Sequence, residues 1–269
     1  MSILIVVVLG IVQGLGEFLP VSSSGHLVLL QKIFGISEQT LFFDTMLHVG
    51  TLFAVVVVLR NDIIAILCRP IQPLTGFLLI ATIPAVVAAL VFGKQIEYAF
   101  SSGRFLGISF LITAVLLCAA ELLSKRTSNA NGYKKADEMN WLDALIIGIF
   151  QAIAIPPGIS RSGATISGAL LRKLDRDFAA RFSFLLSIPA ILGALVLNIK
   201  DLVKNSEAAA GNIGAEVIVG TFTAAIVGFF AIKVMLKIVR EKSLFGFAVY
   251  TAVLGGLILV DQFATHLVF

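Results

Sequence analysis

The chain has 269 residues, of which 58% are hydrophobic and 13% are charged, and its formal net charge is +4. Soluble domains usually carry about 25% charged residues, and no soluble core of this size needs so much apolar surface. The composition therefore excludes an ordinary soluble protein and predicts an all-α integral membrane protein.

Apolar segments of two lengths alternate along the chain. Two pairs of short segments are each divided by a polar loop, here named the first polar loop (20–25, PVSSSG) and the second polar loop (156–163, PPGISRSG). The short segments run near 2–19, 22–35, 141–155 and 163–172. Six longer segments could each cross a hydrocarbon core, which takes roughly 20 residues. They run near 41–60, 73–93, 104–124, 178–199, 214–236 and 244–265.

Each short pair is expected to form a re-entrant helical hairpin. Irregular backbone at membrane depth is tolerated only where protein or a wet cavity satisfies its polar groups, so both polar loops should lie inside the protein. A single long kinked helix at each pair is the alternative.

An internal repeat relates the two pairs. GIVQ at 10–13 corresponds to GIFQ at 148–151, and Ser22, Ser24 and Gly25 correspond to Ser160, Ser162 and Gly163 at the same offset. Three long segments follow each hairpin, so the second half should enter from the opposite face. We expect one membrane domain with an inverted-topology repeat, in which repeat A is about 1–124, a linker is 125–140 and repeat B is about 141–269.

Basic residues predict the orientation. One face collects five of them, namely Lys32, Lys94, Arg104, Lys200 and Lys204. The other collects fourteen, namely Arg60, Arg69, Lys125, Arg126, Lys134, Lys135, Arg172, Lys173, Arg176, Arg181, Lys233, Lys237, Arg240 and Lys242. The positive-inside rule places the second face, with linker 125–140, in the cytoplasm of a multi-pass protein, and both termini outside.

The first hairpin carries an acid deep in apolar sequence. Glu17 lies four residues after Gln13 and should share its helix face. Carboxylates inside membranes are functional candidates by default, although a position at the bilayer surface is the alternative. Ser22, Ser23 and Ser24 open the next helix, where helix capping is the structural alternative, and His26 follows in its first turn.

The second polar loop predicts an anion site. Arg161 lies between Ser160 and Ser162, and Thr165 follows one turn later. A glycine-rich turn feeding a helix N-terminus binds phosphate, and a guanidinium adds a bidentate clamp. Alternatively, Arg161 pairs with Glu17 to join the halves, which is compatible with phosphate binding. Elsewhere, Asp44 and His48 lie four apart, and structural and secondary site roles are equally open there.

These motifs closely resemble those of the undecaprenyl pyrophosphate phosphatase family of the bacitracin-resistance type. QGLGEFLPVSSSGH at 13–26 matches the first family motif, which begins with Glu or Gln and has Glu four residues later, and PGISRSGAT at 157–165 matches the second. The likeness covers essentially the whole chain. It implies removal of the terminal phosphate of undecaprenyl pyrophosphate, which recycles the lipid carrier for peptidoglycan synthesis.

The resemblance also implies residue roles. Glu17, Ser23, His26 and Arg161 would be catalytic, with the nucleophile left open among Ser23, His26 and water. The resemblance further implies Mg²⁺ or Ca²⁺ on Glu17, with Gln13 a weaker ligand candidate. Six residues would contact the substrate phosphates: Ser22, Ser24, Ser160, Arg161, Ser162 and Thr165.

The expected setting is the bacterial plasma (inner) membrane, with the site opening outward. The partners are the polyprenyl pyrophosphate and membrane lipids, with no nucleic acid, and a homodimer is left open. The rival function is a polyprenyl-phosphate transporter, because inverted repeats with broken helices are typical of that class. A non-catalytic scaffold would leave Arg161 and the buried polar loops unexplained.

Overall fold

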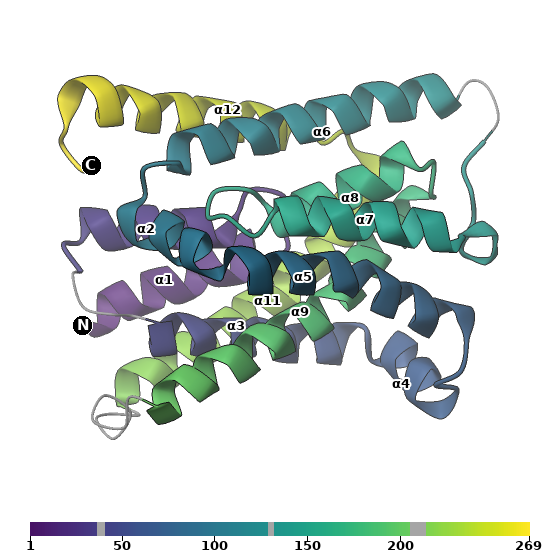
Figure 1. The fold of residues 1–269 in the computed structure, drawn as a ribbon, viewed down its shortest axis with the longest axis horizontal. Coiled ribbons are helices and arrows are strands. Elements are labelled where there is room, and N and C mark those ends of the chain that lie inside the picture. Colours follow the sequence, from purple (N-terminus) through teal and green to yellow (C-terminus); the bar gives the residue numbers. More distant parts are fainter. Residues whose placement is uncertain (37–40, 129–131, 205–213) are drawn as a thin grey trace.

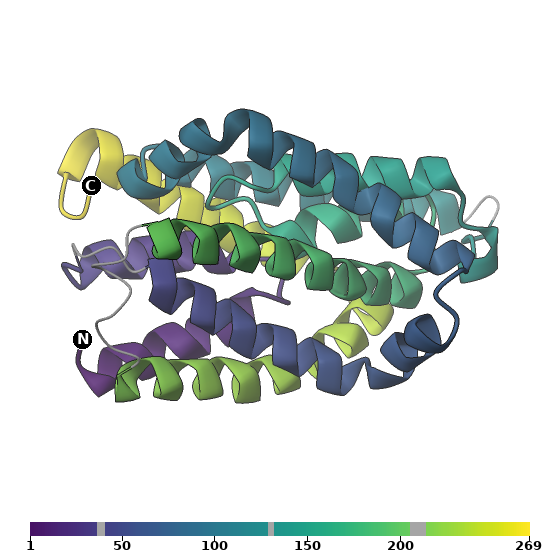
Figure 2. The ribbon, with the colours of Figure 1, turned by 60° about the horizontal axis from the view of Figure 1, so that its bottom comes forward.

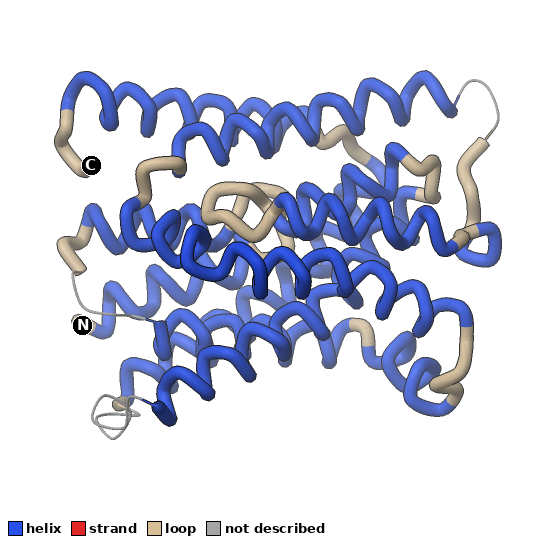
Figure 3. Tube along the Cα trace, viewed as in Figure 1, coloured by secondary structure: helices blue, strands red, loops and turns tan. Residues whose placement is uncertain are grey.

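The computed structural model describes residues 1–36, 41–128, 132–204 and 214–269, and within these ranges the chain is helical without a strand (Figures 1 and 3). An isolated β-bridge joins Lys134 and Leu174. The α-helices are α1 (Ile3–Gly16), α2 (Ser23–Ile33), α3 (Leu41–Val58), α4 (Arg60–Cys68), α5 (Pro73–Ser102), α6 (Leu106–Ser128), α7 (Trp141–Ile153), α8 (Arg161–Leu171), α9 (Arg176–Lys204), α11 (Ala215–Glu241) and α12 (Phe245–Val260).

Among the described residues, five helices are long and apolar enough to cross a membrane, namely α5, α6, α9, α11 and α12. The bent pair α3 and α4 makes a sixth span if it crosses as one unit, although its two helices turn by 79° at their junction. Large apolar side chains on these helices face outward, including Leu90, Phe222 and Val253, each more than half exposed. Such a surface is stable in lipid and costly in water.

Two helical hairpins lie among the long helices. Helices α1 and α2 run antiparallel, with the N-terminus and the end of α2 at one end of the molecule (Figure 1). Helices α7 and α8 form the second hairpin, whose open end lies at the opposite end of the molecule (Figure 1). Each pair therefore forms a helical hairpin and not a single kinked helix, while the re-entrance of the two hairpins in a membrane stays a prediction.

Each hairpin packs on a long helix of the other half of the chain. Helix α1 lies along α11, side by side in Figure 2, and α7 lies along α5. The two halves are therefore interlocked, and their polar loops come together in the middle of the bundle.

The helix boundaries differ in places from those predicted. Helix α5 continues to Ser102, well beyond the expected end near 93, and α6 continues into the predicted linker as far as Ser128. Beyond it, the linker is tied to the second hairpin by the buried carboxylate of Asp143. That carboxylate accepts from Lys134 Nζ at 3.0 Å and from Arg172 Nε at 2.6 Å. This buried ion network fixes the open end of that hairpin.

Candidate active site

The two polar loops lie next to each other, surrounded by helix (Figure 3). Prolines favour the end of both helices here, because a proline lacks the N–H that would bond to the carbonyl four residues earlier and its ring crowds that carbonyl. Pro20 follows the end of α1, and Pro156 and Pro157 follow the end of α7. Glu17 lies one residue beyond α1 but keeps helical φ and ψ angles, and its N–H donates to Gln13 O. Its side chain therefore stays on the Gln13 face, as predicted.

Serine caps begin both returning helices in the same way. Ser22 Oγ accepts from Gly25 N–H at 3.3 Å, and Ser160 Oγ accepts from Gly163 N–H at 3.0 Å. Each cap also lies 3.3 Å from the second following serine, Ser24 or Ser162. The capping alternative is thus confirmed for Ser22, and the structure adds Ser160 as a second cap, while the phosphate contacts of both stay a prediction.

The loops touch directly. A Cβ added to Gly25 would lie 2.7 Å from Gly158 Cα, so only glycine permits this approach. Ser162 Oγ donates to Leu19 O across the contact at 3.1 Å. Thr113 of α6 holds the second loop from behind, because its hydroxyl donates to Gly158 O and accepts from Ser160 N–H, both at 3.0 Å. The α2 and α8 N-termini are thereby brought together.

Glu17 is the centre of the cluster and is only 8% exposed. Its Oε2 accepts from Ser23 Oγ at 2.8 Å and from Gln13 Nε2 at 3.1 Å. Its Oε1 accepts from Arg161 Nη2 at 2.6 Å. The pairing of Glu17 with Arg161, given above as the alternative to phosphate binding, is present in the structure, and the carboxylate joins groups from both halves of the chain.

Arg161 is held on two sides. Besides Glu17, its guanidinium donates through Nη1 to Ser183 O at 3.0 Å. Thr165 lies one turn further along α8, where its hydroxyl donates to Arg161 O at 2.8 Å and contacts Ser183 Oγ at 2.6 Å. Because both terminal nitrogens of the Arg161 guanidinium are held in place, this planar group is already oriented to bind an anion if one partner leaves.

His26 lies outside this cluster. Its Nδ1 lies 2.7 Å from Ser22 O and therefore carries the proton that it donates there. Its Nε2 accepts from Tyr250 Oη of α12 at 2.7 Å. Both ring nitrogens are thus committed, and Ser23 bonds to Glu17 instead. His26 supports the carbonyl of Ser22, whose φ of 70° is unfavourable for a residue with a side chain.

The histidine beside Glu17 is His48 of α3. Its Nε2 lies 3.6 Å from Glu17 Oε2, and its Nδ1 donates to Asp44 O at 2.8 Å. The sequence alone left His48 between a structural and a site role, and the structure places it next to the carboxylate. Asp44 itself accepts from Gln31 Nε2 at 2.9 Å.

Oxygen atoms suited to a hard cation are few. Gln13 Oε1 is buried and has no hydrogen-bond partner among the residues that the structure describes. The Nε2 atom of the same amide donates to Glu17 Oε2, so this free oxygen lies near the carboxylate. Mg²⁺ and Ca²⁺ prefer such oxygens. Within the described residues no group of three or more His, Cys, Asp or Glu could hold a metal. The set fits a cation that takes most of its ligands from phosphate and water.

Three supporting residues were not found by sequence reasoning. Thr113, Ser183 and Tyr250 lie on long apolar helices, where isolated hydroxyls are ordinary. No spacing pattern distinguishes them, because their roles depend on packing between distant segments.

Comparisons with known proteins agree with the likeness seen in the motifs. Residues 6–257 match the family model described as bacitracin resistance protein BacA. The chain is 48% identical over 257 residues to undecaprenyl-diphosphatase of Carboxydothermus hydrogenoformans, covering 96% of both chains. It is 45% identical to undecaprenyl-diphosphatase 4 of Bacillus thuringiensis over 259 residues, with 96% of each covered. The relative from Halothermothrix orenii is 42% identical, with 97% of this chain and 98% of the relative covered. With its candidate spans, its two polar loops and a family match over nearly its whole length, this multi-pass membrane protein belongs to the bacitracin resistance protein BacA family.

Proposed function

We propose that the protein is a membrane phosphatase that hydrolyses undecaprenyl pyrophosphate to undecaprenyl phosphate and inorganic phosphate. This reaction recycles the lipid carrier for peptidoglycan synthesis and confers bacitracin resistance. The relatives are named undecaprenyl-diphosphatase. The proposal rests on the contacts of Glu17, whose carboxylate binds the Ser23 hydroxyl through one oxygen and Arg161 through the other.

Substrate binding would begin at Arg161. A pyrophosphate oxygen replaces the Glu17 carboxylate on the guanidinium, which suits bidentate contact with phosphate. The N-termini of α2 and α8 add positive dipole ends at the same place. This exchange frees Glu17 Oε1 and leaves Ser23 Oγ on Oε2.

Ser23 is the nucleophile that the geometry favours. Its hydroxyl already donates to Glu17 Oε2 at 2.8 Å, so Glu17 can accept the proton as Ser23 Oγ attacks the terminal phosphorus. Glu17 passes this proton to the bridging oxygen as its bond to the terminal phosphorus breaks, and undecaprenyl phosphate leaves. The ionised Glu17 then takes a proton from a water that attacks the phosphoryl group on Ser23. Ser23 Oγ recovers that proton from Glu17 as inorganic phosphate departs. His48 lies where its protonated ring would stabilise the ionised carboxylate.

A divalent cation, Mg²⁺ or Ca²⁺, would be held by Glu17 and Gln13 Oε1 together with the pyrophosphate. The cation would neutralise negative charge on the phosphoryl oxygens. The unpartnered buried oxygen of Gln13 supports this assignment. Chelation should then abolish phosphate release, and added Mg²⁺ or Ca²⁺ should restore it.

The proposed membrane is the bacterial inner membrane, and the proposed topology is an inverted repeat of two re-entrant hairpins with six crossings. Hairpins with their open ends at opposite ends of the molecule support this topology (Figure 1). The linker would be cytoplasmic, with both termini and the site opening outside. Cysteines placed at the termini should react with an impermeant maleimide in whole cells, whereas one in 132–140 should not. Labelling of the linker from outside would reverse the orientation.

Phosphate release in detergent tests the function, because transport cannot occur there. The purified protein should release inorganic phosphate from undecaprenyl pyrophosphate with Mg²⁺ present. With a labelled terminal phosphate and an acid quench, wild-type protein should retain label on Ser23, and Ser23→Ala should retain none. Binding of the lipid without any release of phosphate would favour the transporter. Full turnover by Ser23→Ala would exclude Ser23 and leave His26 or water as the nucleophile.

A further inference from the structure

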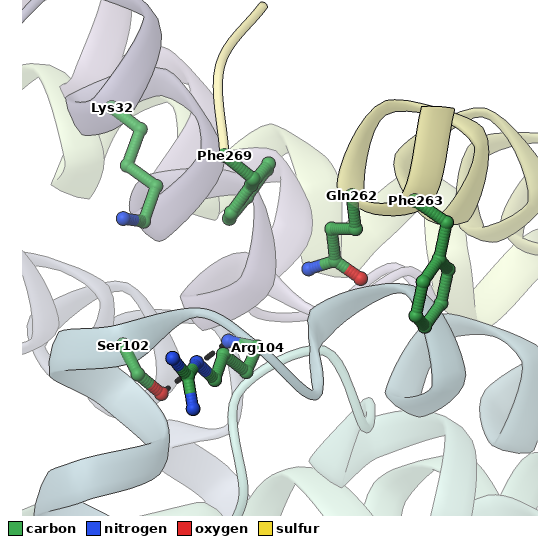
Figure 4. A pocket seen from close by; sticks show the side chains of 6 residues that line it. All are labelled: Lys32, Ser102, Arg104, Gln262, Phe263 and Phe269. Atoms are coloured by element: carbon green, nitrogen blue, oxygen red, sulfur yellow. Dashed lines mark hydrogen bonds between the residues drawn. The ribbon is translucent and has the colours of Figure 1, made fainter. Parts of the chain in front are cut away.

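A cationic cavity, separate from the Glu17 cluster, lies at the end of the molecule that holds both chain termini (Figures 1 and 4). Its volume is about 330 Å³, within the range of small-ligand pockets. It is lined by Lys32, Ser102, Arg104, Gln262, Phe263 and Phe269, from α2, the α5–α6 turn and the segment after α12. None of these residues belongs to the Glu17 cluster.

Within the part of the chain that the structure describes, two cations in this cavity have no acidic partner. No carboxylate among the described residues lies within ion-pair distance of Lys32 or Arg104. Lys32 Nζ lies 5.1 Å from the centre of the Phe269 ring, and Arg104 Nη1 donates to Tyr98 Oη at 3.3 Å. By contrast, Arg172, Arg176 and Arg181 at the opposite end are each paired with a carboxylate.

The nearby carboxylate of Asp261 is engaged elsewhere. It accepts from the N–H groups of Leu267, Val268 and Phe269 and from Thr265 Oγ1. These bonds fold the segment back, so that Phe269 forms a wall of the cavity beside Lys32. Asp261 therefore shapes the cavity without pairing with its cations.

One residue that lines the cavity, Gln262, also has a buried acceptor without a donor among the described residues. Gln262 Nε2 donates to Gly103 O at 2.9 Å, but Gln262 Oε1 is buried with no hydrogen-bond partner in the described chain. Its occupant should therefore carry a hydroxyl as well as anionic oxygens. Exposed apolar side chains adjoin the cavity, with Phe263 79% and Phe105 50% exposed, as expected where lipid chains pass.

We propose that this cavity binds the headgroup of an anionic glycerophospholipid, whose phosphodiester contacts Lys32 and Arg104 and whose headgroup hydroxyl donates to Gln262. The lipid chains lie along Phe263 and the neighbouring apolar surface. Basic clusters at a membrane surface attract such lipids at about 1 kcal/mol for each cation, which is roughly five-fold in affinity. The site is separate from the proposed phosphatase centre and does not depend on it.

Native mass spectrometry of the full chain in detergent tests this site without turnover. The probes are phosphatidylglycerol, phosphatidylcholine, phosphatidylmethanol, which has no headgroup hydroxyl, and inorganic phosphate. Phosphatidylglycerol should bind most tightly. Lys32→Gln and Arg104→Gln should each weaken its binding about five-fold, and the double variant about 25-fold. Lys94→Gln is the matched control, because Lys94 is an exposed cation of α5 outside the cavity, and it should bind like wild type.

Thermal melting checks that each variant is folded. Equal binding by the double variant and Lys94→Gln would overturn the site. Equal binding of phosphatidylmethanol would overturn the role of Gln262, and equal binding of inorganic phosphate would overturn the assignment to a lipid. Loss of phosphatase activity is no part of the readout, so failure of either proposal is distinguishable from failure of the other.

Discussion

The first polar loop places Ser23 one residue after its capping serine, whereas the second places Arg161 there. Both side chains reach Glu17, one on each carboxylate oxygen. Four residues after Gln13 the first half has Glu17, but four residues after Gln151 the second half has Ile155. Two loops with the same caps thus contribute different chemistry to one centre. The two loops are alike in capping, but it is the first half of the chain that supplies the acidic side chain, that of Glu17.

The largest effect is expected from Glu17→Gln, which removes the base while keeping the size of the side chain. Phosphate release should fall by about 10²–10⁴-fold, the usual contribution of a general base. The measurement is kcat for undecaprenyl pyrophosphate, with folding followed by thermal melting. Retained turnover with the same metal dependence would show that Glu17 is not part of the catalytic centre.

Glu121→Gln is the matched control for the acid. Glu121 is buried and its Oε2 pairs with Arg176 Nη2 at 3.0 Å, far along the chain from either polar loop. Breaking this pair should lower the melting temperature, because it leaves a buried charge without its partner. The folded fraction of this variant should keep its kcat.

Arg161→Lys should have the next largest effect. The substitution keeps the charge but loses the planar fork that joins Glu17 Oε1 to Ser183 O. Activity should fall about 10²–10³-fold, as when one pre-organised donor to a developing anion is lost. Arg181→Lys, whose guanidinium nitrogen contacts Asp62 at 2.7 Å, is the control and should turn over normally. Near-normal hydrolysis by Arg161→Lys would leave the second loop with a structural role only.

The two histidines give a smaller, diagnostic contrast. His48→Gln removes a ring that lies 3.6 Å from Glu17, and kcat should fall about ten-fold, the value of one interaction with a charged group. Tyr250→Phe removes only the hydroxyl that donates to His26 Nε2, so its effect on kcat should be smaller still. Steady-state kinetics of both variants would decide this. A larger loss in Tyr250→Phe would return His26 to a direct catalytic role.

Sequence reasoning predicted the parts of the site that depend on local spacing. The interval from Gln13 to Glu17 predicted a shared helix face, and the serine–glycine patterns predicted helix starts just after prolines. The pairing of Glu17 with Arg161 was available as an alternative, because a buried arginine needs a polar partner. Residue spacing and the balance of buried charges can both be read from a single sequence.

The remaining features depend on tertiary packing. The motif resemblance made His26 the catalytic candidate and left His48 open, yet it is His48 whose ring lies 3.6 Å from Glu17. The ring of His26 is engaged by Ser22 O and by Tyr250 of α12, a contact between segments far apart in the sequence. The bend of 79° between α3 and α4 was also missed, because Leu59 carries no proline or glycine signal.

The smallest effect separates the two caps themselves. Ser22 and Ser160 accept the same hydrogen bond, but Ser22 has φ of 70° and Ser160 has φ of −72°. Glycine removes the cap oxygen at either position at a cost of a few tenths of a kcal/mol. At Ser22 it also relieves a left-handed conformation that costs about 1–2 kcal/mol for a residue with a Cβ. Ser22→Gly should therefore leave stability unchanged or raise it, whereas Ser160→Gly should lower it by about 1 kcal/mol through added chain entropy in the unfolded state. Thermal melting of the two single variants in the same detergent measures the difference. Equal losses would mean that the bond from His26 to Ser22 O already offsets the strain, and that the two loops are energetically as well as geometrically alike.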